Sequence, residues 1–135
     1  MTILYLNDLQ KAVFSLLSND SILSGLVSGI YDHAPDGAAF PYVSFGDVRM
    51  ADWSTKTTRG LEYEFELHAW SRNGGKRQCS LIMDVVNDVL QVGTIVTDHG
   101  SIMSMTLKSA EIERENDAIT YRGTMQYRAY LQFNA

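Results

Sequence analysis

The segment LEYEFELHAW, residues 61–70, constrains the fold of this chain more than any other. Every second residue is apolar, and glutamates and a histidine stand between the apolar positions. Successive side chains of a β-strand point to opposite faces of a sheet. The segment therefore predicts a strand with one face in the core and the other toward solvent. Sheets of this kind are usually antiparallel and covered on one face only.

Two amphipathic helices are predicted to supply that cover. Residues 8–18 carry apolar residues at helical spacing, with Asn7 or Asp8 as the expected N-cap. A second helix is expected from about residue 75 to residue 90, with an apolar side and a polar side. Between them, Asp20 or Ser21 is expected to cap a short helical turn that Gly29 ends.

Several further segments have the composition or alternation of strands. They are residues 30–32, 42–50, 101–109, 111–116 and 119–133. We expect the strands at 42–50 and 60–70 to be neighbours joined by a long exposed loop. If the first and last long strands also pair, the glutamates at 62, 64 and 66 lie opposite Arg122 and Arg128. The order of elements predicts a single α+β domain over residues 1–135, a mostly antiparallel β-sheet with two main α-helices packed on one face.

Composition disfavours several classes of function. The formal net charge of -5 is unlike that of proteins that bind the nucleic-acid backbone or an anionic membrane surface. The N-terminal segment lacks a basic region and its apolar run is broken by polar residues, so we expect neither a secretory leader nor a membrane span. The single cysteine, Cys79, excludes an internal disulfide and any metal site with several cysteines.

The segment SRNGGKRQCS, residues 71–80, allows two interpretations. Glycines before a helix can direct backbone N–H groups at a phosphate. The segment nevertheless matches neither the Walker spacing nor the GxGxxG form, and it follows a strand that we expect to be antiparallel. A plain turn and helix cap is therefore favoured. The alternative that stays open is a small enzyme or ligand-binding domain that uses the Gly74–Gly75 loop.

The residues with catalytic or metal-binding chemistry are dispersed. A nucleophilic pair of Cys79 and His68 is disfavoured, because the pattern places Cys79 beside the apolar side of a helix and His68 on the solvent side of a strand. The three histidines, His33, His68 and His99, stand in different elements without metal-binding spacing. We expect no catalytic residue, no metal and no cofactor.

Glutamates form two acidic groups along the chain. The first comprises Glu62, Glu64 and Glu66; the second comprises Glu111, Glu113 and Glu115. Paired carboxylates can perform acid–base catalysis, but a solvated strand face that resists unwanted pairing is the favoured interpretation.

Trp53 stands in the polar stretch ADWSTKTTRG, residues 51–60. An aromatic residue there is either an anchor that folds back onto the sheet or a contact residue, since tryptophan is enriched at the centres of protein interfaces. We expect a contact, and the candidate inter-subunit or tube surface consists of Asp52, Trp53, Lys56 and Arg59.

Several segments together give the chain a resemblance to a known family. They are GIYDHAP leading to FPYVSFGD, the strand ending in ELHAWSRNGG, the helix SLIMDVVNDVL and the terminal TYRGTMQYRAYLQ. In these segments the chain resembles the small tail-completion proteins of long-tailed bacteriophages, prophages and gene transfer agents. That family is similar in fold to the tail terminator proteins.

The resemblance implies a structural virion protein and no enzyme. It implies a homo-oligomer, a hexameric ring at the head-proximal end of the tail tube that stops tube polymerisation. The implied partners are the tail tube protein and a neck or head-completion protein, with DNA passing through the ring without specific binding and no membrane. The alternative within this class is a neck or connector ring. Like charge on a lumen would keep DNA from sticking, and the two groups of glutamates are the candidates for it.

Overall fold

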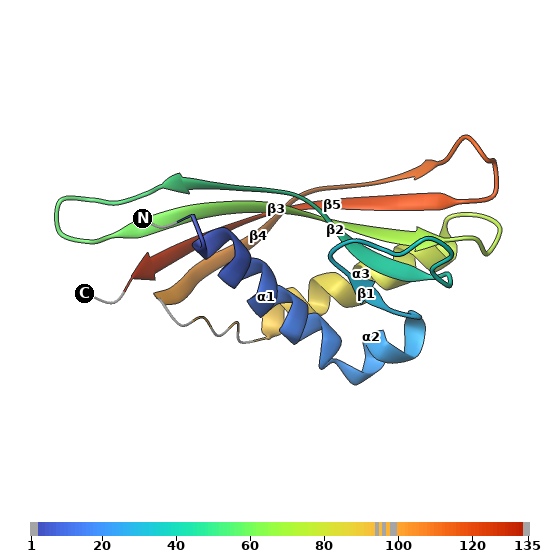
Figure 1. Cartoon of the computed structure of the whole chain (residues 1–135), viewed down its shortest axis with the longest axis horizontal. Helices are drawn as coiled ribbons and strands as arrows, with labels where there is room; N and C mark the ends of the chain where they lie inside the picture. The colour runs from blue at the N-terminus through green and yellow to red at the C-terminus, as the bar shows by residue number, and fades with distance from the viewer. Residues whose placement is uncertain (1–2, 94, 96, 98–99, 134–135) are drawn as a thin grey trace.

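The predicted sheet and helices are present in the structure, a computed structural model that describes residues 3–93, 95, 97 and 100–133. In chain order the elements are α1 (Tyr5–Ser18), α2 (Ser21–Leu26), β1 (Ile30–Tyr31), β2 (Tyr42–Asp52), β3 (Gly60–Ser71), α3 (Arg77–Val92), β4 (Gly100–Arg114) and β5 (Tyr121–Phe133). The strands form one sheet in the order β1-β2-β3-β5-β4, and the helices lie together on one of its faces (Figure 1). The α+β prediction is confirmed.

Strand β3 lies at the centre of the sheet. It pairs in antiparallel fashion with β2 on one side and with β5 on the other. Its alternation is the predicted one, because Leu61, Tyr63, Phe65, Leu67 and Ala69 are buried while the residues between them are partly exposed. The only parallel pair among the described strands is the short one between β1 and β2.

The two long hairpins extend to opposite ends of the sheet (Figure 1). Strands β2 and β3 are joined by residues 53–59, a shorter loop than expected because β2 continues to Asp52 instead of ending at residue 50. Strands β4 and β5 are joined by residues 115–120 at the other end.

The prediction of two separate strands at 101–109 and 111–116 is wrong. Residues 100–114 form one strand, β4, in which Ala110 pairs with Met125 across the expected break. The register shifts between Ile102 and Ser104 and again between Leu107 and Ser109. Each extra residue moves the alternation by one position, so the period of two is interrupted although the strand continues.

The helices differ from the predictions at their ends. Helix α1 begins at Tyr5, so Asn7 and Asp8 lie inside the helix and neither is its N-cap. The ring of Tyr5 packs on Phe133 with centroids 5.1 Å apart, and this tertiary contact supports the first turn in place of a capping side chain. Helix α2 has the predicted cap, since Asp20 accepts a hydrogen bond from the backbone N–H of Leu23 at 2.9 Å.

Helix α2 ends at Leu26 with Val27 as its C-cap, so the prediction that Gly29 ends it is wrong.

The core lies between the helices and the sheet. Its largest fully buried side chains are Tyr63, Tyr127, Phe65, Leu17, Leu23, Leu61, Leu67, Ile82, Met125, Leu131, Val43 and Val86. These residues come from both helices and strands along the whole chain, so the sheet and its cover share one core. The helices leave the other face of the sheet uncovered (Figure 1).

Candidate functional site

The sheet face turned away from the helices is the principal functional candidate and is called the polar face below. On β3 and β5 it consists of Glu62, Glu64, Glu66, His68, Trp70, Arg122, Thr124, Gln126 and Arg128. Each of these positions except Arg122 lies between two buried ones, and Arg122 precedes the buried Gly123, so strand alternation places the side chains there. Register then decides which of them meet.

Arg128 joins two glutamates of β3. Its Nε and Nη2 atoms donate to Oε1 of Glu64 at 3.2 and 3.1 Å, and its Nε lies 3.4 Å from Oε1 of Glu62. Arg49 of β2 approaches Glu64 from the other side, with Nη1 3.4 Å from Oε2. The predicted opposition of Glu64 and Arg128 is confirmed. These glutamates form a cross-strand ladder with arginines and do not stand as a bare acidic row.

Arg122 is not opposite the three glutamates of β3 as expected. In the ladder it pairs with Trp70 of β3 and with Glu113 of β4. Its guanidinium lies 3.2 Å from Oε2 of Glu113 and 3.3 Å from Oε1 of Glu115. The second acidic group is thus tied to β5 by one arginine, while Glu111 lies opposite Thr124 and forms no salt bridge with another described residue.

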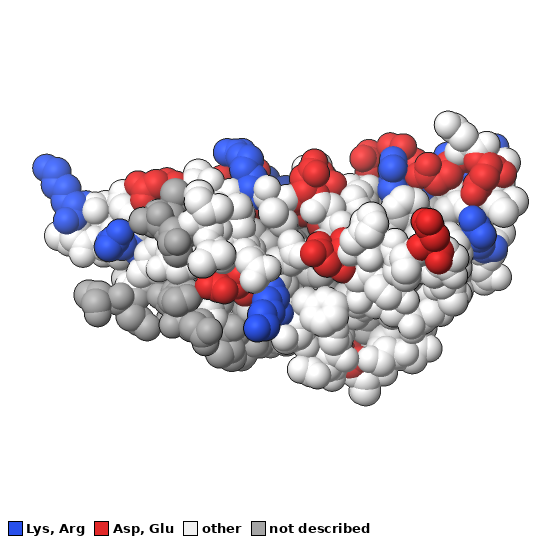
Figure 2. Space-filling model, viewed as in Figure 1, with Lys and Arg blue, Asp and Glu red and all other residues white. Residues whose placement is uncertain are grey.

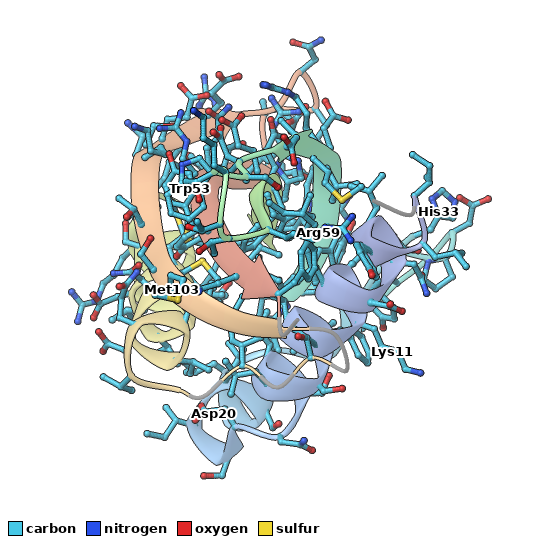
Figure 3. The ribbon with its side chains drawn as sticks, turned by 90° about the vertical axis from the view of Figure 1, so that its left-hand side faces the viewer. Lys11, Asp20, His33, Trp53, Arg59 and Met103 are labelled. Atoms are coloured by element: carbon cyan, nitrogen blue, oxygen red, sulfur yellow. The ribbon has the colours of Figure 1, made fainter. Side chains whose placement is uncertain are left out.

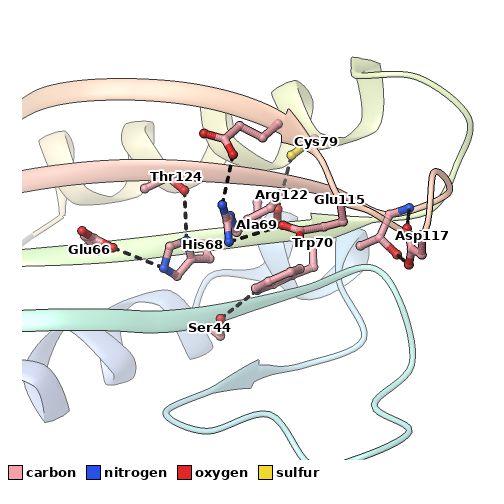
Figure 4. A network of polar contacts seen from close by, with 12 residues as sticks. Ser44, Glu66, His68, Ala69, Trp70, Cys79, Glu115, Asp117, Arg122 and Thr124 are labelled. Atoms are coloured by element: carbon pink, nitrogen blue, oxygen red, sulfur yellow. Dashed lines mark hydrogen bonds and ion pairs between the residues drawn. The ribbon is translucent and has the colours of Figure 1, made fainter.

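His68 lies within this network (Figure 4), and only 17% of its side chain is exposed, less than expected for a surface histidine. Its Nδ1 shares a hydrogen bond with the Thr124 hydroxyl at 3.1 Å, and its Nε2 lies 3.3 Å from Oε1 of Glu66. A Cβ on Gly46 would lie 2.5 Å from that Nε2, so the imidazole occupies space that a side chain at position 46 would fill. Burial lowers the pKa of His68, although Glu66 acts in the opposite direction. The imidazole is a structural link of the polar face.

The hairpin end of the polar face is held by side chains that sequence reasoning missed. The Trp70 indole donates to the Ser44 hydroxyl at 2.9 Å. The Arg72 guanidinium lies 4.0 Å from the centre of the Phe40 ring, and its Nε donates to the Thr120 hydroxyl at 2.9 Å. The hydrogen-bonded partners are 26 and 48 residues apart in sequence, so local spacing does not predict that they meet. The sequence shows only that polar residues stand at the strand ends.

Acidic side chains gather on the sheet side of the molecule, most densely toward the β4–β5 hairpin, with basic atoms among them (Figure 2). Asp117 at that hairpin accepts hydrogen bonds from the hydroxyl and backbone N–H of Thr120 and from the N–H of Ile119, and these lower its pKa. The negative charge of Glu113, Glu115 and Asp117 near this hairpin is therefore held by local hydrogen bonds and arginines.

The predicted contact surface at the β2–β3 hairpin is placed at the end of the sheet (Figure 3). The ring centroids of Trp53 and Tyr130 lie 4.4 Å apart, yet 48% of Trp53 is exposed. Asp52 accepts a hydrogen bond from the Ser54 hydroxyl at 2.8 Å, and Lys56 and Arg59 are exposed. Trp53 is both anchored on the sheet and open to a partner, so the two expectations are not exclusive.

Cys79 and His68 lie on opposite faces of the sheet. The Cys79 thiol is fully buried against the helix side and donates to the backbone oxygen of Ala69 at 3.3 Å. Burial raises the pKa of this thiol, which opposes formation of a nucleophilic thiolate. The preference for a buried, hydrophobe-like cysteine over a Cys–His pair is confirmed.

Gly74 and Gly75 form the turn between β3 and α3. Both have positive φ angles, 53° and 97°, which favour glycine for conformational reasons alone. Helix α3 begins two residues later, at Arg77, without a capping side chain. The loop geometry agrees with the turn interpretation.

Neither a metal centre nor a membrane span emerges from the described part of the chain. Residues 3–93, 95, 97 and 100–133 contain no group of three or more histidine, cysteine or acidic residues that could hold a metal ion. His33 is exposed, and His99 lies outside the described residues. Over the same residues, every helix is too short or too polar to cross a bilayer.

Comparisons with known proteins agree with the resemblance seen in the sequence. The family model described as "Tail completion protein gp17" matches residues 11–132. A chain from the virion of a native gene transfer agent particle is 27% identical, with a TM-score of 0.86, and the similarity covers 97% of this chain and 99% of that one. No curated protein sequence matches.

A second solved structure supports the fold. The gp17 protein of bacteriophage SPP1 is 19% identical, with a TM-score of 0.64 over 97% of this chain and 92% of that one. The family match spans nearly the whole chain, and the structural matches are to proteins of phage or phage-like particles. The chain therefore belongs to the gp17 family of tail completion proteins.

Proposed function

We propose that the protein forms a ring at the head-proximal end of the tail tube, where it ends tube polymerisation and presents the docking surface for the neck. The observation that carries the proposal is the similarity, over nearly the full length of both chains, to a chain of a gene transfer agent virion. Membership in the tail completion family supports the same assignment.

A structural role fits the way the polar face uses its charges. Glu62 and Glu64 engage Arg128, while Glu113 and Glu115 engage Arg122. Acid–base catalysis needs a group that is free to exchange a proton with a substrate. Carboxylates already bound to arginines stabilise the sheet and its shape instead.

The polar face is the surface that we place toward the lumen of the ring. Its glutamates outnumber its arginines, so it keeps an excess of negative charge after the internal salt bridges are made. Like charge on a lumen repels the DNA backbone and allows DNA to pass without binding. Glu111 is the best candidate for a glutamate that repels DNA, because it forms no salt bridge with another described residue.

The lumen assignment is tested by Glu111→Lys, with Asp88→Lys on the exposed side of α3 as the matched control. The first variant should slow DNA delivery by particles with intact tails, and the second should not. The effect of replacing Glu62, Glu64 and Glu66 together would be harder to interpret, because that variant also loses the salt-bridge partners of Arg128. Equal delivery by both variants would contradict the lumen position.

The terminating role is tested with purified tail tube protein. Added during polymerisation, the protein should stop tube growth and be found by electron microscopy at one end of each tube. If it leaves tube growth unchanged and binds the head portal instead, the protein acts in the neck.

A further inference from the structure

We infer that neighbouring copies in the proposed ring join by antiparallel pairing of β4 of one copy with the free length of β2 of the next, and that Asp47 and Lys108 select this contact. The inference rests on the proposed ring and states how it closes. The partner is a second copy of this chain.

The sheet has two long open edges. Strand β1 pairs with β2 only at Val43 and Ser44, so no described strand pairs with the outer side of β2 from Phe45 to Asp52. At the opposite edge, all of β4 pairs with β5 on one side and with no described strand on the other. Each edge offers a row of unpaired backbone N–H and C=O groups, which is a template for another strand.

The directions of the two edges fit each other. The pairs β2–β3, β3–β5 and β5–β4 are all antiparallel, so β2 and β4 run in opposite directions. A neighbour related by rotation about a ring axis can therefore place its β2 antiparallel to β4, and the sheet continues from copy to copy. This contact joins different surfaces, and repeated rotation closes such contacts into a ring.

Both edges carry a bulge with a charged residue. On β2, Gly46 and Asp47 together oppose the single residue Glu66, and on β4 the extra residue between Leu107 and Ser109 is Lys108. Asp47 and Lys108 are exposed, and neither forms a salt bridge within the described part of the chain. Bulges and charges on edge strands oppose indiscriminate pairing.

The signs of these charges distinguish the possible contacts. Pairing of two β4 edges would bring Lys108 toward Lys108, and pairing of two β2 edges would bring Asp47 toward Asp47. At the two bulges, only the β4–β2 contact brings the opposite charges of Asp47 and Lys108 together. Since an exposed ion pair contributes little by itself, the backbone hydrogen bonds hold the contact and the charges select it. The exposed apolar side chain of Met103 lies on the same edge strand and adds area to it.

The test uses the full-length protein and measures assembly mass by light scattering and native mass spectrometry. The variants are Asp47→Lys, Lys108→Glu and the two combined, with Lys11→Glu on the exposed side of α1 as the control. Each single variant should raise the concentration needed for assembly by about tenfold or more, because like charges then meet at every contact. The combined variant and the control should assemble like the wild type.

Mixing gives the most specific result. D47K carries positive charge at both edges and K108E carries negative charge at both. The two should therefore co-assemble in alternation at a concentration at which neither assembles alone. Circular dichroism checks that every variant is folded.

If both single variants form rings at the same concentration as the wild type, the edge contact is overturned. The proposed ring itself would then still stand. If the single variants fail and the mixture also fails, the charges do not select the contact and the inference is again overturned. Absence of any ring of the wild type, both free in solution and on tail tubes, would count against the proposed function itself.

Discussion

Glu64 and Arg128 face each other across the central strand pair, and two nitrogen atoms of the guanidinium donate to the same carboxylate oxygen at 3.2 and 3.1 Å. The pair joins residues that are 64 positions apart in sequence. It therefore stabilises the register between β3 and β5, on which the arrangement of the whole polar face depends. A hydrogen bond with Glu62, and then those from Arg128, lower the pKa of Glu64.

This lowered pKa predicts a pH-dependent contribution to stability. Because the folded pKa lies below the ordinary value of 4.5, the contribution is present above that value and is lost as the pH falls through the folded pKa. Glu64→Gln should therefore be less stable than the wild type near neutral pH, and the difference should shrink in acid. Urea unfolding over that pH range measures it. A difference that stays constant in acid would contradict the ionic origin.

Gly123 is expected to tolerate no side chain. A Cβ there would lie 2.8 Å from Sγ of Cys79 and would overlap Sδ of Met83, so Gly123→Ala should lower the free energy of unfolding by about 1–3 kcal/mol. Gly25→Ala is the matched control, because a Cβ there meets nothing within 4 Å. Denaturant unfolding of both variants gives the comparison. Similar stabilities of the two would show that the space around Gly123 is larger than described.

Two buried tyrosines should respond in opposite ways to loss of the hydroxyl. The Tyr63 hydroxyl is buried and has no hydrogen-bond partner among the described residues, whereas the Tyr127 hydroxyl donates to Oδ1 of Asn87 at 3.0 Å. Tyr63→Phe should leave stability unchanged or raise it by about 1 kcal/mol, and Tyr127→Phe should lower it by about 1 kcal/mol. Thermal and urea unfolding measure both. A large loss in Tyr63→Phe would mean that this hydroxyl has a partner.

Trp53 should contribute to both stability and assembly. Trp53→Ala removes the contact with the Tyr130 ring, and the free energy of unfolding should fall by about 0.5–1.5 kcal/mol. Capping of tail tubes should be lost at protein concentrations where the variant is still folded. Trp53→Phe retains an aromatic contact and should keep more of the stability. Full capping activity in Trp53→Ala would make this residue an internal anchor only.

The sequence was sufficient to predict elements with an uninterrupted period. The alternation in residues 61–70 and the apolar stripe of α3 both predicted faces that the structure confirms. Strand β4 was divided wrongly because Met103 and Lys108 are inserted at register shifts, and a sequence pattern does not mark a bulge. The start of α1 was missed because a contact between Tyr5 and Phe133, at opposite ends of the chain, supports it.

The candidate site was predictable in composition but not in pairing. Alternation placed the glutamates on the solvent face, yet register determined that Arg128 meets Glu64 and that Arg122 meets Glu113. The position of His68 also depends on the space left by Gly46 on a neighbouring strand, 22 residues earlier in the printed sequence. Contacts between distant strands follow from the fold as a whole and not from local spacing.

The central claim is tested most directly by electron microscopy of particles from cells in which only this gene is deleted. The proposed role predicts tails of abnormal length and heads that remain unjoined. Tails of normal length beside separate heads would contradict tube termination and place the protein in the neck, and normal particles would contradict a role in tail completion altogether.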